Sequence, residues 1–420
     1  MSAWYRRVRD GIVAGGDTRD AAPHDPAAQR PDRAVAWGSA AVLVGLLAWL
    51  GASNPWTLVF VAGLIVSVFL HEVGHFATAR WSGMKVTQFY MGFGPRLWWR
   101  RRGELEYGVR VLPVGAFVRI VGMNNLDQCD PADEPRSYRA QSYPKRLLVI
   151  TAGSIVHLLI ALAIFSGVYA TAGRFEDTGR VTLVAPPVEG SPAESIGLSE
   201  GDVILAVGDV AVASQGELVA AITAYEPGDR VVVSVLRDSE RLTLPVVLAP
   251  SPADASVGFL GVGTDSWGTR RLGPVAAVGY GALDVGRTAV QSVGGVLTVL
   301  NPVNLVRSVV SEDADPASRP TTVVGASRLG GELGREIGIE GPLVLLAAVN
   351  VFVGVFNMLP LLPFDGGHAA IATYERLRTR RGRVYRADVG KMVPVATAVV
   401  ALLVTLLVVG LYLDVARPIG

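Results

Sequence analysis

The chain has 420 residues, of which 50% are apolar and 18% charged, with a formal net charge of +1. This composition is typical of a membrane protein with several spans and argues against a soluble enzyme. The basic residues lie in blocks between apolar runs, without an aromatic-basic surface pattern, so no nucleic-acid partner is expected. The single cysteine, Cys129, excludes an internal disulfide and a multi-thiolate zinc site.

About five apolar runs are long enough to cross roughly 30 Å of hydrocarbon, which takes ~20 residues of helix. These runs are 34–52, 56–80, 147–172, 342–362 and 393–413. Blocks of Lys and Arg precede the first run and separate the second from the third and the fourth from the fifth. The positive-inside rule places these blocks in the cytoplasm and 173–341 outside. We therefore predict a multi-pass protein of the plasma (inner) membrane, in contact with the lipid bilayer.

The chain begins with a basic cytoplasmic arm, 1–33, whose Ala, Asp and Pro content predicts disorder. The N-terminal membrane core follows over 34–172. Its second span ends in the motif His-Glu-x-x-His, formed by His71, Glu72 and His75. A helix places residues four apart on one face, so the two histidines can share a Zn²⁺ while Glu72 acts beside them as a general base. Two histidines at a membrane interface are the alternative, but polar groups in lipid usually have a function.

After the second span, 84–120 combines Gly and Pro with alternating apolar and polar residues, which predicts a β-hairpin. The third span contains His157, and a polar residue inside a span usually faces the helix bundle. A structural or substrate-contact role for His157 and a catalytic or accessory metal role both remain open.

The segment 178–250 is predicted to be a compact extracytoplasmic α+β domain with one main helix over 217–225. Its sequence resembles a PDZ domain of the bacterial protease type, a kind of domain that can capture a chain end as an added strand. The next segment, 251–341, is predicted to be an extracytoplasmic connector. Within it, 273–311 is Gly-rich and carries two charges, so we expect amphipathic packing rather than a span.

The C-terminal membrane core, 342–420, supplies a candidate for the third metal ligand that a catalytic zinc usually needs. Asp365 follows the fourth span at its cytoplasmic end, which is the membrane depth predicted for His71. Pro360 and Pro363 interrupt regular helix just before it, and such backbone is tolerated at this depth only around a cavity or inside protein. A helix cap at the interface is the alternative role for Asp365.

The two motifs together, His-Glu-x-x-His and a distal Asn…Pro…Asp-Gly that begins at Asn357, resemble the site-2 protease family of intramembrane zinc metalloproteases. The resemblance runs from about Val61 to the C-terminus, and 84–120 looks like the membrane-associated β-hairpin of that family. Phe364 stands where the family commonly has Leu. The family often has Gly-x-x-x-Asn in the next span, and this chain has His157 at the Asn position.

The resemblance implies a zinc-dependent metalloendopeptidase with Zn²⁺ on His71, His75 and Asp365. Glu72 would be the general base, and Asn357 would hold the extended substrate backbone or the developing oxyanion. The form with one extracytoplasmic domain looks like the actinobacterial proteases that cleave anti-sigma factors. The implied substrates are therefore single-span membrane proteins of the anti-sigma factor type, already cut by another protease.

Two other functions fit the sequence. The chain could be a membrane-anchored PDZ scaffold with an inactive zinc site, although the intact Glu72 argues against this. It could also be a metalloprotease that cuts soluble peptides at the cytoplasmic face. For the PDZ-like domain, a role as a steric filter that admits only shortened substrates is favoured over a role in binding them.

Overall fold

A computed structural model describes residues 33–123, 129–311, 318–380 and 384–418. The chain divides into two compact units, one made of Met1–Gly167 with Ala277–Gly420 and the other of Val168–Ala276. The predicted arm, 1–33, lies outside the described residues except for its last residue.

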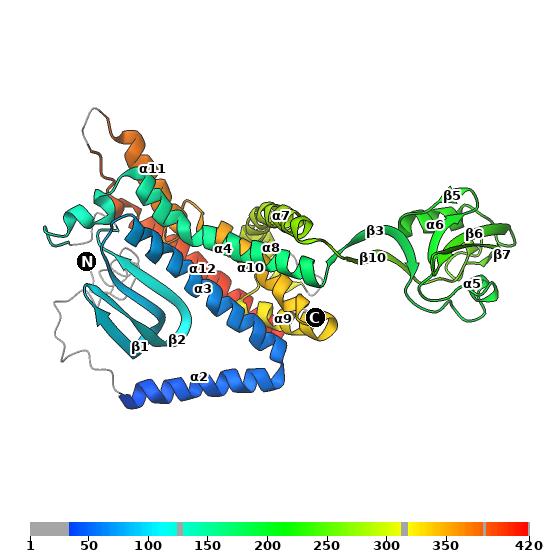
Figure 1. The fold of residues 1–420 in the computed structure, drawn as a ribbon, viewed down its shortest axis with the longest axis horizontal. Helices are drawn as coiled ribbons and strands as arrows, with labels where there is room; N and C mark the ends of the chain where they lie inside the picture. The colour runs from blue at the N-terminus through cyan, green and yellow to red at the C-terminus, as the bar shows by residue number, and fades with distance from the viewer. Residues whose placement is uncertain (1–32, 124–128, 312–317, 381–383, 419–420) are drawn as a thin grey trace. The chain divides into compact units, whose positions relative to one another are not determined.

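The first unit is built mainly of helices (Figure 1). They are α2 (Arg33–Ser53), α3 (Pro55–Trp81), α4 (Tyr143–Thr171), α7 (Pro274–Leu300), α8 (Pro302–Val310), α9 (Val323–Ile337), α10 (Glu340–Asn357), α11 (Asp365–Arg378) and α12 (Val393–Ala416). Among the described residues, four helices are long and apolar enough to cross a membrane: α3, α4, α10, and α12 with the short turn before it. They correspond to four of the predicted spans.

Two other segments differ from the sequence prediction. The predicted span 34–52 falls on α2, whose apolar part, Trp37–Ser53, is shorter than the other four. The predicted amphipathic segment 273–311 forms α7 and α8, which are bent by 71° and together are apolar enough for a further span. Its two charges do not break α7, because Arg287 Nη1 lies 3.3 Å from Asp284 Oδ1 one turn away. Each charge thus partly neutralises the other within a continuous helix.

Helix α3 carries the His-Glu-x-x-His motif, and its start is fixed by a polar cap. The side chain of Asn54 accepts hydrogen bonds from the backbone N–H groups of Trp56 and Thr57, and Pro55 occupies the first turn. Both features satisfy or remove N–H groups that a helix start leaves unpaired. The helix then runs without interruption to Trp81, so His71 and His75 lie one turn apart on its buried face.

The predicted β-hairpin is present as β1 (Val86–Arg102) and β2 (Leu105–Ile120), which pair antiparallel. The ring of Phe89 on β1 packs against Phe69 and Phe76 of α3, with centroid distances of 5.7 and 5.2 Å. These two α3 residues flank the histidine motif. The hairpin is therefore packed beside that motif, and its residues share a buried apolar cluster with α4 and α11.

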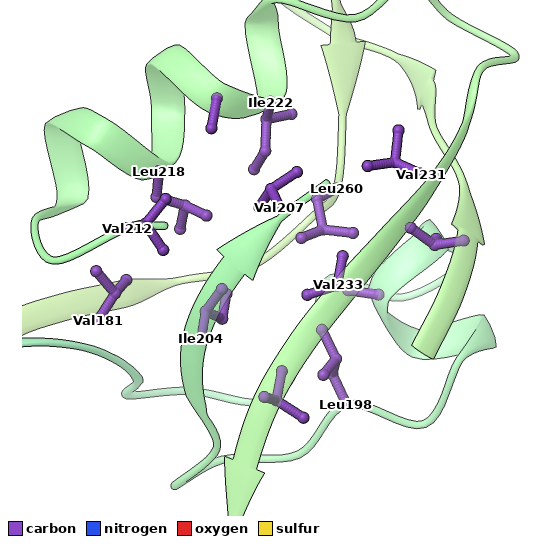
Figure 2. Packing of buried hydrophobic residues seen from close by; sticks show 14 of the residues in the cluster. Val181, Leu198, Ile204, Val207, Val212, Leu218, Ile222, Val231, Val233 and Leu260 are labelled. Carbon is purple, nitrogen blue, oxygen red and sulfur yellow. The ribbon is translucent and has the colours of Figure 1, made fainter. Parts of the chain in front are cut away.

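The second unit contains a six-stranded sheet in the order β10-β3-β4-β6-β7, with β5 paired to β4. Its elements are β3 (Arg174–Leu183), α5 (Pro192–Ser195), β4 (Val203–Val207), β5 (Val210–Ala211), α6 (Gln215–Thr223), β6 (Arg230–Arg237), β7 (Glu240–Val247), β8 (Ala249–Pro250), β9 (Gly258–Phe259) and β10 (Thr264–Arg270). Figure 2 shows Leu218 and Ile222 of α6 directed toward Val207 and Val233 of the sheet, which form one core.

The sheet of this unit extends past both ends of the predicted domain, 178–250. Strand β10 pairs antiparallel with β3, from Thr264 opposite Leu183 to Arg270 opposite Arg174. Residues assigned from sequence to a connector thus complete the sheet. Strand β10 gives a weak strand signal in the sequence, because it contains polar residues and a glycine and lacks the Val-rich pattern of β6.

Candidate metal centre

The side chains of His71, His75 and Asp365 converge, and their ligand atoms all lie within 4.8 Å of one another. The two histidine Nε2 atoms are 3.1 Å apart, and Asp365 Oδ2 lies 3.5 Å from the first and 3.2 Å from the second. Zinc bonds of about 2.05 Å in a tetrahedral arrangement put neighbouring ligand atoms roughly 3.3 Å apart. The three atoms therefore have the spacing of one face of a zinc tetrahedron, and two imidazoles with one carboxylate are a donor set that zinc prefers.

The ring of His75 is oriented by the backbone of α4. Its Nδ1 lies 2.7 Å from the carbonyl oxygen of Val149, which can only accept, so Nδ1 carries the proton and donates. Nε2 then has a free lone pair directed at His71 and Asp365. A hydrogen bond of this kind to the second nitrogen is the usual way in which a metal-binding histidine is held in one tautomer.

The ring of His71 lies against the backbone of α4 at Gly153. A Cβ atom at position 153 would come within 2.3 Å of the His71 ring carbon Cε1. On the other side of this contact, a Cβ at Gly74 of α3 would come within 2.9 Å of Val156. Small residues on both helices therefore allow α3 and α4 to approach closely enough to enclose the histidine, which is only 8% exposed.

Asp365 is the first residue of α11 and reaches the histidines from a tightly folded loop after α10. A Cβ at Gly366 would lie 2.2 Å from the carbonyl oxygen of Met358, and one at Gly367 would lie 2.7 Å from the backbone of Leu361. The glycine pair thus lets the loop fold back over the start of α11. A carboxylate at this position also interacts favourably with the helix N-terminus.

Helix α11 is held against α4 by a buried ion pair. Arg146 Nη2 lies 2.8 Å from Glu375 Oε2, and Glu375 Oε1 accepts a hydrogen bond from the backbone N–H of Ala387. One turn away, the hydroxyl groups of Tyr143 and Thr373 are 3.2 Å apart. These contacts fix the helix that carries Asp365 relative to the helix that holds both histidine rings.

The two residues predicted to be catalytic occupy different positions relative to this cluster. Glu72 Oε1 lies 4.0 Å from His71 Nε2, with its side chain 18% exposed. Asn357 is the last residue of α10, and its side chain makes no hydrogen bond among the described residues. The structure thus brings Glu72 to the histidines and leaves the role of Asn357 as a prediction.

His157 lies beside the cluster without joining it. Its ring centroid is 4.9 Å from that of His71, but within the described part of the chain the potential ligands are limited to His71, His75 and Asp365. Its Nδ1 lies 2.7 Å from Oδ1 of Asn350 on α10, whose amide in turn reaches Ser67 on α3. Asn350 and Ser67 were not among the predicted site residues, although a polar residue within an apolar span is a signal for such a role.

The chain matches a known protein family over most of its length. The family model described as "Peptidase family M50" matches residues 59–401. The chain is 34% identical over 396 residues to the zinc metalloprotease Rip1 of Mycobacterium tuberculosis (strain H37Rv), covering 86% of this chain and 97% of that protein. It is 31% identical over 399 residues to the Rip1 of Mycolicibacterium smegmatis, covering 86% of this chain and 98% of that protein.

Among solved structures, the PDZ domain of an SdrC-like protein from Listeria monocytogenes is 21% identical, with a TM-score of 0.18. The match covers 21% of this chain and 88% of that domain.

The family match and the two relatives confirm the resemblance to site-2 proteases and the prediction of a zinc cofactor. Together with this family match, the four helices that are long and apolar enough to cross a membrane indicate a multi-pass membrane protein. The chain therefore belongs to peptidase family M50, the site-2 protease family, and is a zinc-dependent metalloendopeptidase.

Proposed function

We propose that this protein cleaves peptide bonds within the transmembrane segments of other membrane proteins, at a zinc ion held by His71, His75 and Asp365. The observation that carries the proposal is the position of the ligand triangle. Two of its members lie on α3, a helix long and apolar enough to cross a membrane, and their side chains are buried. A protease acting only outside the membrane has no need of buried ligands on such a helix.

A zinc ion held by His71, His75 and Asp365 would act as a Lewis acid and would lower the pKa of a bound water molecule to about 7. Glu72 takes the proton from the attacking water and passes it to the leaving amine, a role that fits its carboxylate position 4.0 Å from His71 Nε2. Asn357 holds the extended substrate backbone or donates to the developing oxyanion. No covalent bond between enzyme and substrate forms in this reaction.

The substrate helix has to unwind before its backbone can be attacked, and unpaired backbone groups are costly in a bilayer. The hairpin offers a replacement for the lost hydrogen bonds. Residues 88–91 of β1 pair with β2 on both sides, with 106–109 and with 116–119, so among the described residues the open edges of the sheet are formed by 96–102 and 116–120. We propose that the unwound segment adds to such an edge as a further strand, beside the motif that the hairpin contacts through Phe89.

The proposed substrates are single-span proteins of the anti-sigma factor type that another protease has already shortened. The basic blocks in the sequence favour a cytoplasmic position for the metal centre and an extracytoplasmic position for the unit Val168–Ala276. In that arrangement this unit acts as a PDZ-like steric filter that excludes substrates with bulky outer domains. A site that binds the substrate's new chain end is the alternative role.

The cleavage position tests this function against the alternative of a protease for soluble peptides. Full-length protein in liposomes is incubated with a single-span substrate and with a soluble peptide, and the products are mapped by mass spectrometry. We expect a cut inside the spanning segment, and none with Glu72→Gln, which retains zinc but lacks the base. Cleavage confined to loops or to the soluble peptide would contradict the proposal.

A second experiment identifies the substrates. Membrane fragments are compared by proteomics between cells that carry the wild-type protein and cells that carry Glu72→Ala, and fragments found only with the wild type come from substrates.

A further inference from the structure

Three buried polar side chains from three different helices form a chain of hydrogen bonds beside the metal centre. His157 of α4 meets Asn350 of α10 with 2.7 Å between Nδ1 and Oδ1, and Asn350 Nδ2 donates to Ser67 Oγ of α3 over 3.1 Å. The three residues are 2%, 0% and 1% exposed. Polar groups buried this deeply in an apolar bundle are expensive unless each one is satisfied, so the arrangement of the whole set is constrained.

The hydrogen bonds define the tautomer of His157. Asn350 uses its amide nitrogen twice, donating to Ser67 Oγ and, over 2.8 Å, to the carbonyl oxygen of Leu346. Ser67 Oγ donates to the carbonyl of Gly63 and is therefore an acceptor toward Asn350. The amide oxygen of Asn350 then faces His157, so Nδ1 of His157 must carry the proton and donate. The ring is fixed in both tautomer and direction.

His157 is also confined by packing. A Cβ at Gly354 of α10 would come within 3.2 Å of His157 Cβ, so α4 and α10 are in close contact at this level. On the side toward α3, the His157 ring lies 4.9 Å from the His71 ring at an interplanar angle of 45°. Because Gly153 and His157 both lie close to it, the His71 ring has little freedom to rotate about its side-chain bonds.

We infer that His157 is a positioning residue: anchored by Asn350 and Ser67, its ring sets the orientation in which His71 presents Nε2 to the metal. The inference rests on the proposed role of His71 as a ligand. Partners that orient a ligand from outside the coordination sphere typically change metal affinity tenfold to a hundredfold when they are removed.

The test measures zinc affinity by chelator competition on the full-length protein in detergent, together with the absorption spectrum of the Co²⁺-substituted form. We expect His157→Ala to weaken zinc binding by about tenfold or more and to change the Co²⁺ ligand-field bands. His157→Phe keeps a ring of similar size and should recover part of the affinity. Asn350→Ala removes the acceptor of the His157 Nδ1 hydrogen bond and should weaken zinc binding although both imidazole rings remain in the protein.

The control variant is Thr322→Val, which removes a partly buried hydrogen bond of the same unit, from Thr322 Oγ1 to Asp414 Oδ2. It should lower thermal stability and leave zinc affinity and the Co²⁺ spectrum unchanged. His71→Ala separates this inference from the proposed function: if that variant binds zinc normally, the ligand assignment fails. A different result overturns only the inference about His157. In that case His71→Ala abolishes zinc binding, but the zinc affinities of the other variants stay within twofold of wild type and their Co²⁺ spectra are unchanged. Those variants are His157→Ala, His157→Phe and Asn350→Ala.

Discussion

Gly153 of α4 and His71 of α3 are in such close contact that a single added carbon atom cannot fit between them. A Cβ at 153 would come within 2.3 Å of the His71 ring carbon Cε1 and within 2.6 Å of both ring nitrogens. The neighbouring atoms belong to a ring that is itself confined, so relief requires either the ring or the α4 backbone to move. The absence of a side chain at this position is therefore a condition for the ligand geometry.

We predict that Gly153→Ala weakens zinc binding at least tenfold and reduces proteolysis, because the His71 ring is displaced from the ligand triangle. Zinc content by elemental analysis and chelator competition provide the measurement. Gly167→Ala is the matched control on the same helix, since a Cβ there meets no atom within 4 Å. Equal zinc affinity in the two variants would show that the α3–α4 contact does not shape the site.

Some residues of this site follow from their spacing within a single helix, and others depend on how the helices pack together. His71, Glu72 and His75 could be predicted because their spacing within one helix fixes a shared face, and Asp365 because a carboxylate after an interrupted span is unusual. The contacts of Gly153, Asn350 and Ser67 could not be predicted from the sequence. Their contributions depend on where α3, α4 and α10 cross, and spacing within a single helix says nothing about that crossing.

For the fold as well, some elements could be predicted from the sequence and others could not. Long apolar runs predicted α3, α4, α10 and α12, because burial in lipid needs only length and composition. The glycines and two charges of 273–311 predict amphipathic packing, whereas α7 and α8 are together apolar enough for a span, and Asp284 pairs with Arg287. Strand β10 was missed for a different reason. Its pairing with β3 joins segments more than eighty residues apart, and its own polar sequence gives no strand signal.

Replacing Asp365 should separate its role from that of its neighbour His368. We predict that Asp365→Ala strongly lowers zinc occupancy, because two histidines alone leave the site with one protein ligand fewer than catalytic zinc usually has. Asp365→Asn should retain more metal than Asp365→Ala but less than wild type, since a neutral amide is a weaker ligand. Elemental analysis of purified protein measures both.

His368→Ala is the control for this pair, because His368 lies one turn along α11 and outside the cluster of potential ligands within the described residues. It should keep full zinc occupancy. Loss of metal from His368→Ala together with retention in Asp365→Ala would reverse the proposed assignment.

The buried ion pair between Arg146 and Glu375 should affect both stability and the metal site. Their side chains are only 10% and 4% exposed, so removing one charge leaves the other buried without its partner. We predict that Glu375→Gln lowers the free energy of unfolding by about 2–4 kcal/mol. This loss is slightly smaller than that expected when one side chain of a buried ion pair is removed entirely, because Gln can keep one hydrogen bond. Zinc affinity should fall as well, since α11 also carries Asp365.

Thermal unfolding in detergent and chelator competition measure the two effects. Glu332→Gln offers a surface comparison, because its ion pair with Arg328 on α9 is exposed, and such pairs contribute about 0–1 kcal/mol. A Glu375→Gln variant as stable as Glu332→Gln would show that the pair does not anchor α11.

The second unit should lose stability in acid through Asp202. Arg237 hydrogen-bonds this carboxylate with Nε at 2.7 Å and Nη2 at 2.6 Å, and the backbone N–H of Ser199 also donates to it. These contacts hold the pKa of Asp202 below its ordinary value of 3.8. Because the folded unit binds this proton less readily than the unfolded chain, the stabilisation is complete above pH 4 to 5. It is lost as the pH falls through 3.8 toward the lower folded-state pKa.

We predict that Arg237→Met destabilises this unit at pH 7 by about 1–3 kcal/mol, less than a fully buried pair would, because Arg237 is partly exposed to solvent. The difference in free energy of unfolding between the wild type and Arg237→Met should become smaller as the pH is lowered through about 4. Protonation of Asp202 then removes the charge that the arginine stabilises. Hydrogen–deuterium exchange of β4 in the full-length protein, corrected for the pH dependence of chemical exchange, measures it. A deficit that stays constant from pH 7 to pH 3 would mean that Arg237 stabilises the unit by packing and not through the charge of Asp202.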